Sequence, residues 1–377
     1  MKLRILFFTT ATEHTTFRKT AKMLAKEGAH VKIVGFTRNN FPAGTDTVPT
    51  EILGKINHGN YFRRFINLFK SISKLREYAK NYDIVHCFAL DTLIIANIAL
   101  TFQKKKIVYQ VQDIKRQLIG NNIKSRLYRF IERLLLKNII QLIVSSEDYH
   151  THYFAKHHNF SSKLTTVIEN KLETEPLLTF DDSTQNSSLN KHIRLGYFGV
   201  MRCIRSWEIL KKSIQKSQGV FSLYLRGKPN AMPNLSNEIS SERFISFDGP
   251  YRSPDDLKII YESVDLVWAA YPYGFEKEGN WQMARTIRFY EACAYGRPVL
   301  VQKGTPHASF VSRLNIGKVI DMSNINMAID QILSINPEDI KTWENNLLKI
   351  DRSLFIHTDE FTKLYQTLFE AVKTNNN

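Results

Sequence analysis

The helix expected over residues 287–294 carries the clearest chemistry in this sequence. Arg288 and Glu291 stand three positions apart, so a helix places both on one face. A guanidinium can bind a diphosphate through two parallel hydrogen bonds, and a carboxylate can accept hydrogen bonds from both vicinal hydroxyls of a ribose. Gly296 and Pro298 then follow at the spacing that ends a helix and begins a strand. Such a pair could therefore hold a ligand that carries both phosphate and hydroxyl groups, and an ordinary exposed helix acid is the alternative for Glu291.

A basic turn in the same half of the chain is a second candidate anion site. The strand expected at residues 193–198 is followed by Gly199, and Arg202 and Arg205 flank the turn into the next helix. We expect that helix to begin at about Ser206, a good N-cap residue. Backbone N–H groups at a helix N-terminus attract anions. Arg205, and after it Arg202, are therefore candidates for binding an anion, although a basic turn is often only solvated surface.

The segments around these residues alternate between apolar strands and amphipathic helices, which predicts parallel sheets covered by helices. In the first half we expect strands at residues 3–9, 31–36, 83–87, 107–111 and 141–145, with helices at 17–27, 92–99 and 125–137. In the second half we expect strands at 193–198, 221–225, 244–247, 266–270 and 298–301, with helices at 206–216, 255–263 and 287–294. Residues 180–190 are rich in Ser, Asp and Asn, which predicts a linker. The fold class is therefore α/β, with two doubly wound domains at 1–172 and 191–354.

Residues 288–300 read RFYEACAYGRPVL and resemble the pattern K-x-x-E-A-x-A-x-G-x-P-V-I of glycosyltransferases with the GT-B fold. Residues 261–267 resemble the Tyr-to-Asp step that precedes it in the large retaining family of bacterial lipopolysaccharide and capsule transferases. The resemblance implies two Rossmann-like domains facing a cleft, with helices at about 355–377 crossing back to the first. It also implies a retaining hexosyltransferase, independent of metal and of other cofactors. Its nucleotide-sugar donor, UDP-sugar favoured, would supply a glycan or lipid-linked acceptor in surface polysaccharide synthesis.

Roles in the second domain follow from the same resemblance. It implies that Arg205, Arg202 and Arg288 hold the donor diphosphate. Arg288 stands where the family has a lysine. Glu291 would bind the ribose, and Gly227, at the end of a predicted strand, would border the base.

The loop expected to meet the donor sugar departs from the family pattern. The family has a second glutamate eight positions before the one at Glu291, and Met283 occupies that position here. We expect Asn280, Trp281 and Gln282 to offer backbone amides and polar side chains in its place. Retention and inversion of the anomeric centre both stay open at this point.

The first domain is expected to bind the acceptor. Residues 108–114 resemble a family segment that often reads Tyr-Asp-x-His-Asp, but Gln110 and Gln112 replace its first Asp and its His. Asp113 remains, and is the candidate for an acceptor-side base or orienting group. His86 is the second catalytic candidate. A histidine at a strand end is often only structural, so that alternative stays open.

The charge of the chain favours an anionic partner. The net charge is +16, and residues 61–80 place arginines and lysines beside an aromatic face. Such a helix can lie on an anionic membrane, and packing of its aromatic face on the domain core is the alternative. Since no apolar run reaches 18 residues, we expect a cytoplasmic protein, either free in solution or peripheral at the inner face of the cell membrane.

Two other classes of protein stay open as alternatives. One is a sugar-nucleotide epimerase of the same fold, and the other is a basic nucleic-acid-binding protein. No nucleic-acid module is recognisable, so we expect no nucleic-acid partner. The three cysteines are far apart and show no metal-ligand spacing, so no metal site is expected.

Overall fold

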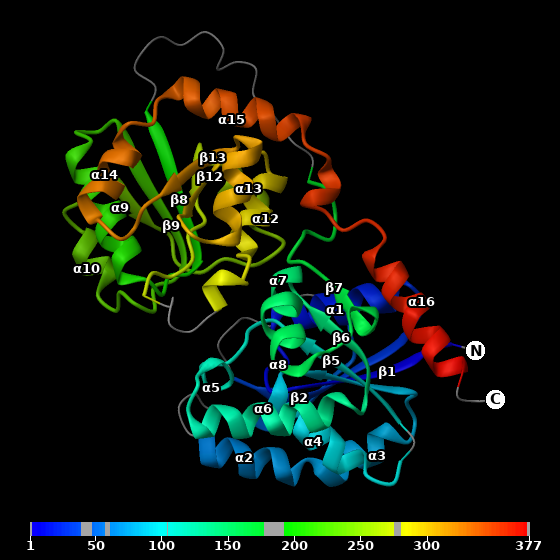
Figure 1. Cartoon of the computed structure of the whole chain (residues 1–377). Coiled ribbons are helices and arrows are strands. Elements are labelled where there is room, and N and C mark those ends of the chain that lie inside the picture. The colour runs from blue at the N-terminus through cyan, green and yellow to red at the C-terminus, as the bar shows by residue number, and fades with distance from the viewer. Residues whose placement is uncertain are drawn as a thin grey trace. The chain divides into compact units, whose positions relative to one another are not determined.

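The computed structural model describes residues 2–38, 47–56, 61–103, 105–176, 192–274 and 280–374, apart from the side chains of 61–65 and 116. The chain forms two compact units, each built on a parallel sheet flanked by helices (Figure 1). Unit 1 contains Met1–Glu169 and Thr358–Asn377, and unit 2 contains Asn170–His357. The predicted α/β class with two Rossmann-like sheets is therefore confirmed.

Unit 1 is built on a seven-stranded sheet in the order β3-β2-β1-β4-β5-β6-β7, with every pair parallel. Its strands are β1 (Arg4–Thr9), β2 (His30–Thr37), β3 (Thr50–Lys55), β4 (Ile84–Phe88), β5 (Lys106–Val111), β6 (Ile139–Val144) and β7 (Thr165–Val167). The inner strands are apolar runs because helices cover both faces of the sheet. The sequence pattern misses β3 and β7, since these edge strands are only partly buried and lack such a run.

Helices cover both faces of this sheet (Figure 1). One layer contains α2 (Tyr61–Lys70), α3 (Ile72–Ala79), α4 (Leu90–Leu100) and α6 (Ile123–Leu136). The other face carries α1 (Thr15–Lys26) and α16 (Glu360–Lys373), which pack in one core cluster. Shorter helical segments are α5 (Arg116–Ile119), α7 (Glu147–Tyr149), a π-helix (His150–Ala155), α8 (Lys156–His158) and a 3-10 turn (Ser162–Leu164). Within the described residues, no helix is both long and apolar enough to span a membrane.

Unit 2 contains a six-stranded sheet in the order β10-β9-β8-β11-β12-β13, again wholly parallel. Its strands are β8 (Ile193–Val200), β9 (Phe221–Lys228), β10 (Ile245–Phe247), β11 (Leu266–Trp268), β12 (Val299–Gln302) and β13 (Gly317–Ile320). Its helices are α9 (Ile204–Lys216), α10 (Leu235–Ile239), α11 (Leu257–Glu262), α12 (Ile287–Ala294), α13 (Pro306–Leu314), α14 (Ile325–Leu333) and α15 (Pro337–Lys349). Two buried apolar clusters, one with Trp207 and one with Phe289, form its core.

The chain enters and leaves unit 2 through two segments that pair with each other. The Leu172 N–H donates to the Phe355 carbonyl oxygen at 2.9 Å, and the His357 N–H donates to the Leu172 carbonyl oxygen at 2.9 Å. Residues 170–172 and 355–357 therefore belong to unit 2, a few residues away from the boundaries expected at 172 and 355. The expected linker at 180–190 lies outside the described residues.

Candidate functional site

The sheet of unit 2 changes direction between β8 and β11. From β8 the chain proceeds outward to β9 and β10, whereas from β11 it proceeds to β12 and β13 on the other side. In open α/β sheets, ligands bind beyond the carboxyl ends of the strands at such a switch point. The residues that follow β8 and β11 are therefore expected to form the candidate binding site.

Arg288 joins the ends of these two strands. Its Nη1 donates to the Phe198 carbonyl oxygen at 2.7 Å, and its Nη2 donates to the Ala270 carbonyl oxygen at 3.2 Å. The guanidinium also lies over the Tyr197 ring, 5.0 Å from its centroid. Its Nε–H is buried and has no acceptor among the described residues. Helix α12 thus places a fixed cation at the switch point.

Two glycines leave the neighbouring strand ends without side chains. Gly199 and Gly227 are paired in β8 and β9, with φ of +90° and +128°. A Cβ on Gly227 would lie 1.9 Å from the Gly199 carbonyl oxygen, so the two backbones can approach only without a side chain. A Cβ on Gly199 would lie 3.7 Å from the Tyr251 hydroxyl and 3.9 Å from Arg288 Nη1. Gly227, which is expected near the base, therefore lies beside the end of β8, and its partner Gly199 lies next to Arg288.

Helix α9 begins beside the same strand ends, but its cap differs from the predicted one. The helix starts at Ile204, and the N-cap is Cys203 rather than Ser206. Cys203 Sγ accepts the N–H groups of Ser206 and Tyr273, both at 3.3 Å. The cap prediction was wrong because a cysteine sulfur is an unusual cap. Ser206 is instead buried, and its Oγ has no partner in the described part of the chain.

The two predicted arginines of this turn have different surroundings. Arg205 lies over the Tyr273 ring, with its guanidinium carbon 4.6 Å from the ring centroid. Because Tyr273 also donates to the helix cap, Arg205 is held at the α9 N-terminus between the ends of β8 and β11. Arg202 is exposed. Arg205 is therefore the better positioned of the two for an anion at this end of the sheet.

Glu291 is buried rather than exposed. It is the fifth residue of α12, not near its start, and is 5% accessible. The Tyr261 hydroxyl donates to Glu291 Oε2 at 2.7 Å. Burial, and then the neighbouring carboxylate, raise the pKa of Tyr261 well above its usual value, so this hydroxyl stays a donor. A carboxylate still has acceptor capacity beyond one such bond.

The predicted donor-sugar loop forms a short 3-10 helix, Asn280–Gln282. Met283, which stands where the family has an acid, is buried, and its N–H donates to the Asn280 carbonyl oxygen at 2.9 Å. The Trp281 ring lies close to Gly304, where a Cβ would come within 3.2 Å of it. The side chain at this position is thus apolar and buried.

Two buried side chains from distant parts of the sequence hold the segment between this loop and α12. His307 Nε2 accepts the Thr286 N–H at 2.8 Å, and Asn170 Nδ2 donates to the Arg285 carbonyl oxygen at 3.1 Å. Burial, and then the charge of Arg285, lower the pKa of His307 to about 3, so it is neutral and can accept. Because Asn170 and His307 are distant in sequence from this segment, no local motif could reveal them.

His86 lies in the interior of unit 1. It is fully buried in β4, its ring stacks on Phe7 at 4.3 Å, and its Nε2 is 2.9 Å from Gln110 Oε1. Gln110 in turn donates to the Thr20 hydroxyl at 3.1 Å. Burial lowers the pKa of His86 to about 3. The placement favours the structural alternative over the catalytic prediction for His86.

Asp113 has the opposite placement. It follows β5 at the carboxyl edge of the unit 1 sheet, and its side chain is exposed. The Tyr149 hydroxyl lies 3.5 Å from its Oδ1. The predicted catalytic pair therefore consists of one accessible carboxylate and one enclosed histidine.

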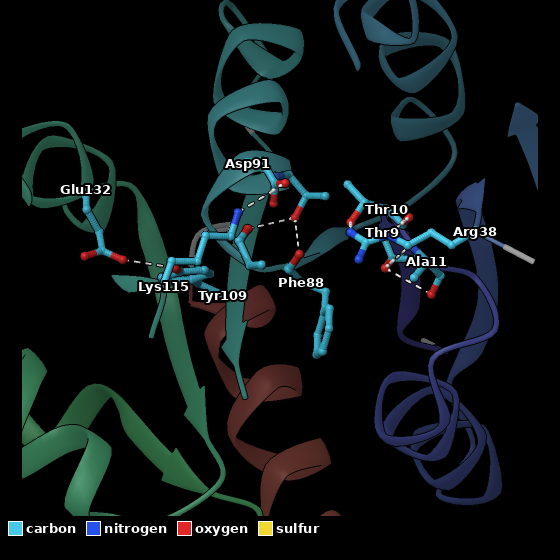
Figure 2. A network of polar contacts seen from close by, with 11 residues as sticks. Thr9, Thr10, Ala11, Arg38, Phe88, Asp91, Tyr109, Lys115 and Glu132 are labelled. Carbon is cyan, nitrogen blue, oxygen red and sulfur yellow. Dashed lines mark hydrogen bonds and ion pairs between the residues drawn. The ribbon is translucent and has the colours of Figure 1, made fainter. Parts of the chain in front are cut away.

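Other polar side chains gather at the same edge of unit 1 (Figure 2). Arg38, after β2, donates from Nε to the Thr10 carbonyl oxygen at 3.1 Å and from Nη2 to the Thr10 hydroxyl at 2.7 Å. Lys115, after β5, forms an ion pair of 3.4 Å with Asp91 in the first turn of α4. The switch point of this sheet lies between β1 and β4. No sequence motif indicates these residues, because only the fold brings them to the same edge of the sheet.

The described residues contain no group of three or more His, Cys, Asp or Glu side chains that could hold a metal ion. The three cysteines, Cys87, Cys203 and Cys293, are buried free thiols.

Comparison with known proteins identifies the architecture as the GT-B fold, with two Rossmann-like units. No protein-family model matches the chain. It is 28% identical over 339 residues to the succinoglycan biosynthesis protein ExoL of Rhizobium meliloti, covering 86% of this chain and 82% of that protein. Sucrose-phosphate synthase from Thermosynechococcus elongatus superposes with a TM-score of 0.73 at 16% identity, covering 98% and 100% of the two chains. Anabaena HepE, in a complex with UDP and glucose, has a TM-score of 0.67 at 16% identity, covering 98% and 99%. The predicted GT-B fold is confirmed, and the resemblance to GT-B glycosyltransferases is supported.

Proposed function

We propose that this chain is a glycosyltransferase of surface polysaccharide synthesis. Unit 2 binds a nucleotide-diphosphate sugar, UDP-sugar favoured, and unit 1 binds a glycan or lipid-linked glycan acceptor. The observation that carries the proposal is the position of Arg288, which joins the ends of β8 and β11 at the switch point, one helical turn from the buried Glu291. Similarity to a succinoglycan biosynthesis protein and to a structure that contains UDP supports this assignment.

The donor diphosphate lies beside Arg288 and the N-terminus of α9 in this proposal. When the sugar leaves, negative charge develops on the diphosphate, and fixed cations and backbone N–H groups stabilise it. The buried Nε–H of Arg288 is a donor available for that role, since it has no acceptor among the described residues. Arg205, fixed over Tyr273, supplies a second cation, and the exposed Arg202 a third.

The nucleoside lies on the Glu291 side of the same site. Tyr261 holds one carboxylate oxygen of Glu291. In this proposal the carboxylate also accepts hydrogen bonds from the ribose hydroxyls. Gly227 and Gly199 allow the base to approach the strand ends without a side chain in between. Asn280, Trp281 and Gln282 remain the candidates for the sugar, with Met283 giving that part of the site an apolar wall.

Acceptor activation is proposed for Asp113. Its exposed carboxylate stands at the carboxyl edge of unit 1 and can orient a hydroxyl or take its proton. We propose that transfer needs no metal and that the reaction retains the anomeric configuration, as the family resemblance implies. The stereochemical outcome can be read directly by NMR of the product formed from a donor of known configuration.

A peripheral location at the inner face of the cell membrane completes the proposal. Ile66 and Phe69 of α2 are exposed beside Lys70, whereas Leu68 and Leu75 are buried. Part of the 61–80 segment therefore packs on the core while another part offers apolar and cationic groups to an anionic surface. Arg63 and Arg64 lie among the side chains that the structure does not describe.

Calorimetric titration with UDP tests the donor site. We expect Arg288→Ala to weaken UDP binding by about 10–100-fold, because a charged hydrogen-bond donor to the diphosphate is lost. The UDP affinity of Arg288→Lys should lie between those of the wild type and Arg288→Ala, because lysine keeps the charge but not the hydrogen bonds to both strand ends. Arg313→Ala, an exposed arginine on α13, is the matched control. Equal affinity for UDP in all four proteins would refute the assignment.

Product analysis separates transfer from the other two classes of function. With a UDP-sugar and a lipid-linked acceptor, a transferase releases UDP only when the acceptor gains the sugar. Recovery of the donor with an epimerised sugar would instead identify an epimerase. Tight binding of RNA or DNA at physiological salt, without UDP binding, would favour the nucleic-acid alternative.

A further inference from the structure

Helix α6 of unit 1 presents an apolar stripe outward, toward solvent. Ile123, Leu127, Phe130 and Leu134 are 84%, 58%, 56% and 46% accessible. They are spaced i, i+4, i+7 and i+11, which places them on one line along the helix. Four large apolar side chains on one exposed line form a surface that monomeric proteins seldom leave in water.

The opposite side of α6 is fixed to the unit by a buried carboxylate. Glu132 is completely buried, and it accepts hydrogen bonds from the hydroxyls of Tyr109 and Tyr153. His158 Nε2 lies 3.0 Å from the same carboxylate. Figure 2 shows Glu132, which belongs to α6, reaching the Tyr109 hydroxyl of β5. Rotating the helix to hide its apolar stripe would withdraw this carboxylate from its partners, so the stripe is held outward by the fold.

A row of cations runs beside the stripe. Arg126, Arg133 and Lys137 are exposed and spaced i, i+7 and i+11, so they follow one edge of the same helix face. Lys124 is exposed on the other side. The one acid of α6, Glu132, is buried, so the outer face of the helix carries no negative side chain.

We propose that the outer face of α6 inserts into the interface of an anionic lipid bilayer. The apolar stripe would enter the boundary between headgroups and acyl chains, while the flanking cations meet lipid phosphates. An anionic lipid surface fits this face because the row of cations complements the lipid phosphates and the apolar stripe beside it is continuous. This site is distinct from the α2 segment considered above, and it does not depend on which sugar nucleotide binds unit 2.

Vesicle sedimentation of the full chain tests the proposal. We expect binding to phosphatidylglycerol-containing vesicles and a loss on the order of 100-fold in partitioning for the double variant Leu127→Ser, Phe130→Ser, at roughly tenfold per apolar side chain withdrawn from lipid. The control is Ile259→Ser with Met327→Ser, two exposed apolar residues of unit 2. Equal partitioning of both double variants would overturn the proposal. UDP titration of the same proteins measures the donor site independently. A failure of the donor assignment can therefore be distinguished from a failure of the lipid proposal.

A second measurement does not depend on these serine variants. The native cysteines are buried, so Phe130→Cys can be labelled selectively with an environment-sensitive fluorophore. We expect a blue shift on addition of anionic vesicles, and none for the labelled Ile259→Cys protein. If sedimentation equilibrium instead shows a dimer that Leu127→Ser, Phe130→Ser dissociates, with no blue shift on vesicles, then a second copy covers α6 and the lipid proposal is wrong.

Discussion

Glu291 and Tyr261 show how one buried contact prepares a side chain for a ligand. The carboxylate is 5% accessible and is reached by a tyrosine whose ring also stacks on Tyr295, with centroids 5.3 Å apart. A side chain held in one rotamer loses little freedom when a ligand binds, so its hydrogen bonds contribute more to affinity. We therefore expect Tyr261 to contribute to nucleotide binding by positioning Glu291.

Replacing Tyr261 by Phe removes the hydroxyl and leaves the ring. Because Glu291 is buried, loss of this donor should lower the free energy of unfolding by about 1–3 kcal/mol. UDP affinity should fall as well, by about tenfold or less. Tyr295→Phe is the control, since Tyr295 contributes ring stacking to the same cluster. If urea unfolding and calorimetry give the same values for Tyr261→Phe and the wild type, the positioning role is wrong.

The two buried histidines predict sensitivity to acid. The folded-state pKa values of His86 and His307 are both lowered to about 3, against about 6.5 in the unfolded chain. Their stabilising contribution is therefore fully present above pH 6.5 and is lost as the pH falls toward 3, because only the unfolded chain takes up the protons.

At pH 5 each histidine should account for about 2 kcal/mol of lost stability relative to pH 7.5. Urea unfolding of the wild type and of His307→Gln, at both pH values, measures this contribution. The difference in the free energy of unfolding between pH 7.5 and pH 5 should be smaller by about 2 kcal/mol in the variant than in the wild type. A difference of the same size in both proteins would mean that His307 titrates normally.

The candidate site residues of unit 2 have stronger local signals in the sequence than those of unit 1. Arg288, Glu291 and Arg205 belong to local motifs whose spacing is tied to one helix or one turn, so the sequence alone could select them. His86 shows the limit of that approach, because a strand-end histidine looks the same whether it faces a ligand or a core. Arg38 and Lys115 could not be selected, since only the packing of separate strands brings them to the same edge of the sheet.

At the scale of elements, the expected strands and helices of the two sheets are present, with ends that shift by a few residues. Strong apolar runs such as β1 and β8 are easily recognised because both faces are buried. The edge strands β3 and β7 lack such runs. The α9 boundary was misplaced because the cap is a cysteine, which propensity rules rank poorly.

The close approach of β8 and β9 predicts a strong effect of adding one carbon. In Gly227→Ala the new Cβ would meet the Gly199 carbonyl oxygen at 1.9 Å, so the strand ends must separate. We expect a loss of about 3–5 kcal/mol in stability and loss of UDP binding. Gly28→Ala is the matched control, because its φ is also positive, at +103°, but the space around it is open. Gly28→Ala should cost only about 1–2 kcal/mol, for the backbone conformation alone.

At the scale of the whole molecule, the net charge of +16 should make membrane association dependent on salt. Replacing Arg63, Arg64 and Lys70 together by Glu should release the protein from anionic vesicles, at about 1 kcal/mol for each cation near the surface. The control replaces Lys212, Lys216 and Lys349, exposed lysines of unit 2, by Glu and so has the same net charge. If both triple variants bind equally, net charge rather than the 61–80 segment governs association.

The way the chain returns to unit 1 has a consequence for its synthesis on the ribosome. Phe361, Leu364 and Leu368 of α16 belong to the same buried cluster as Leu3 and other residues from the start of the chain. Unit 2 is continuous in sequence, so all of its residues leave the exit tunnel before α16 does. Residues Met1–Glu169 are translated before unit 2, so part of the core of unit 1 stays uncovered until α16 emerges. Deletion of Thr358–Asn377 should accordingly expose unit 1 to proteases while unit 2 stays protected.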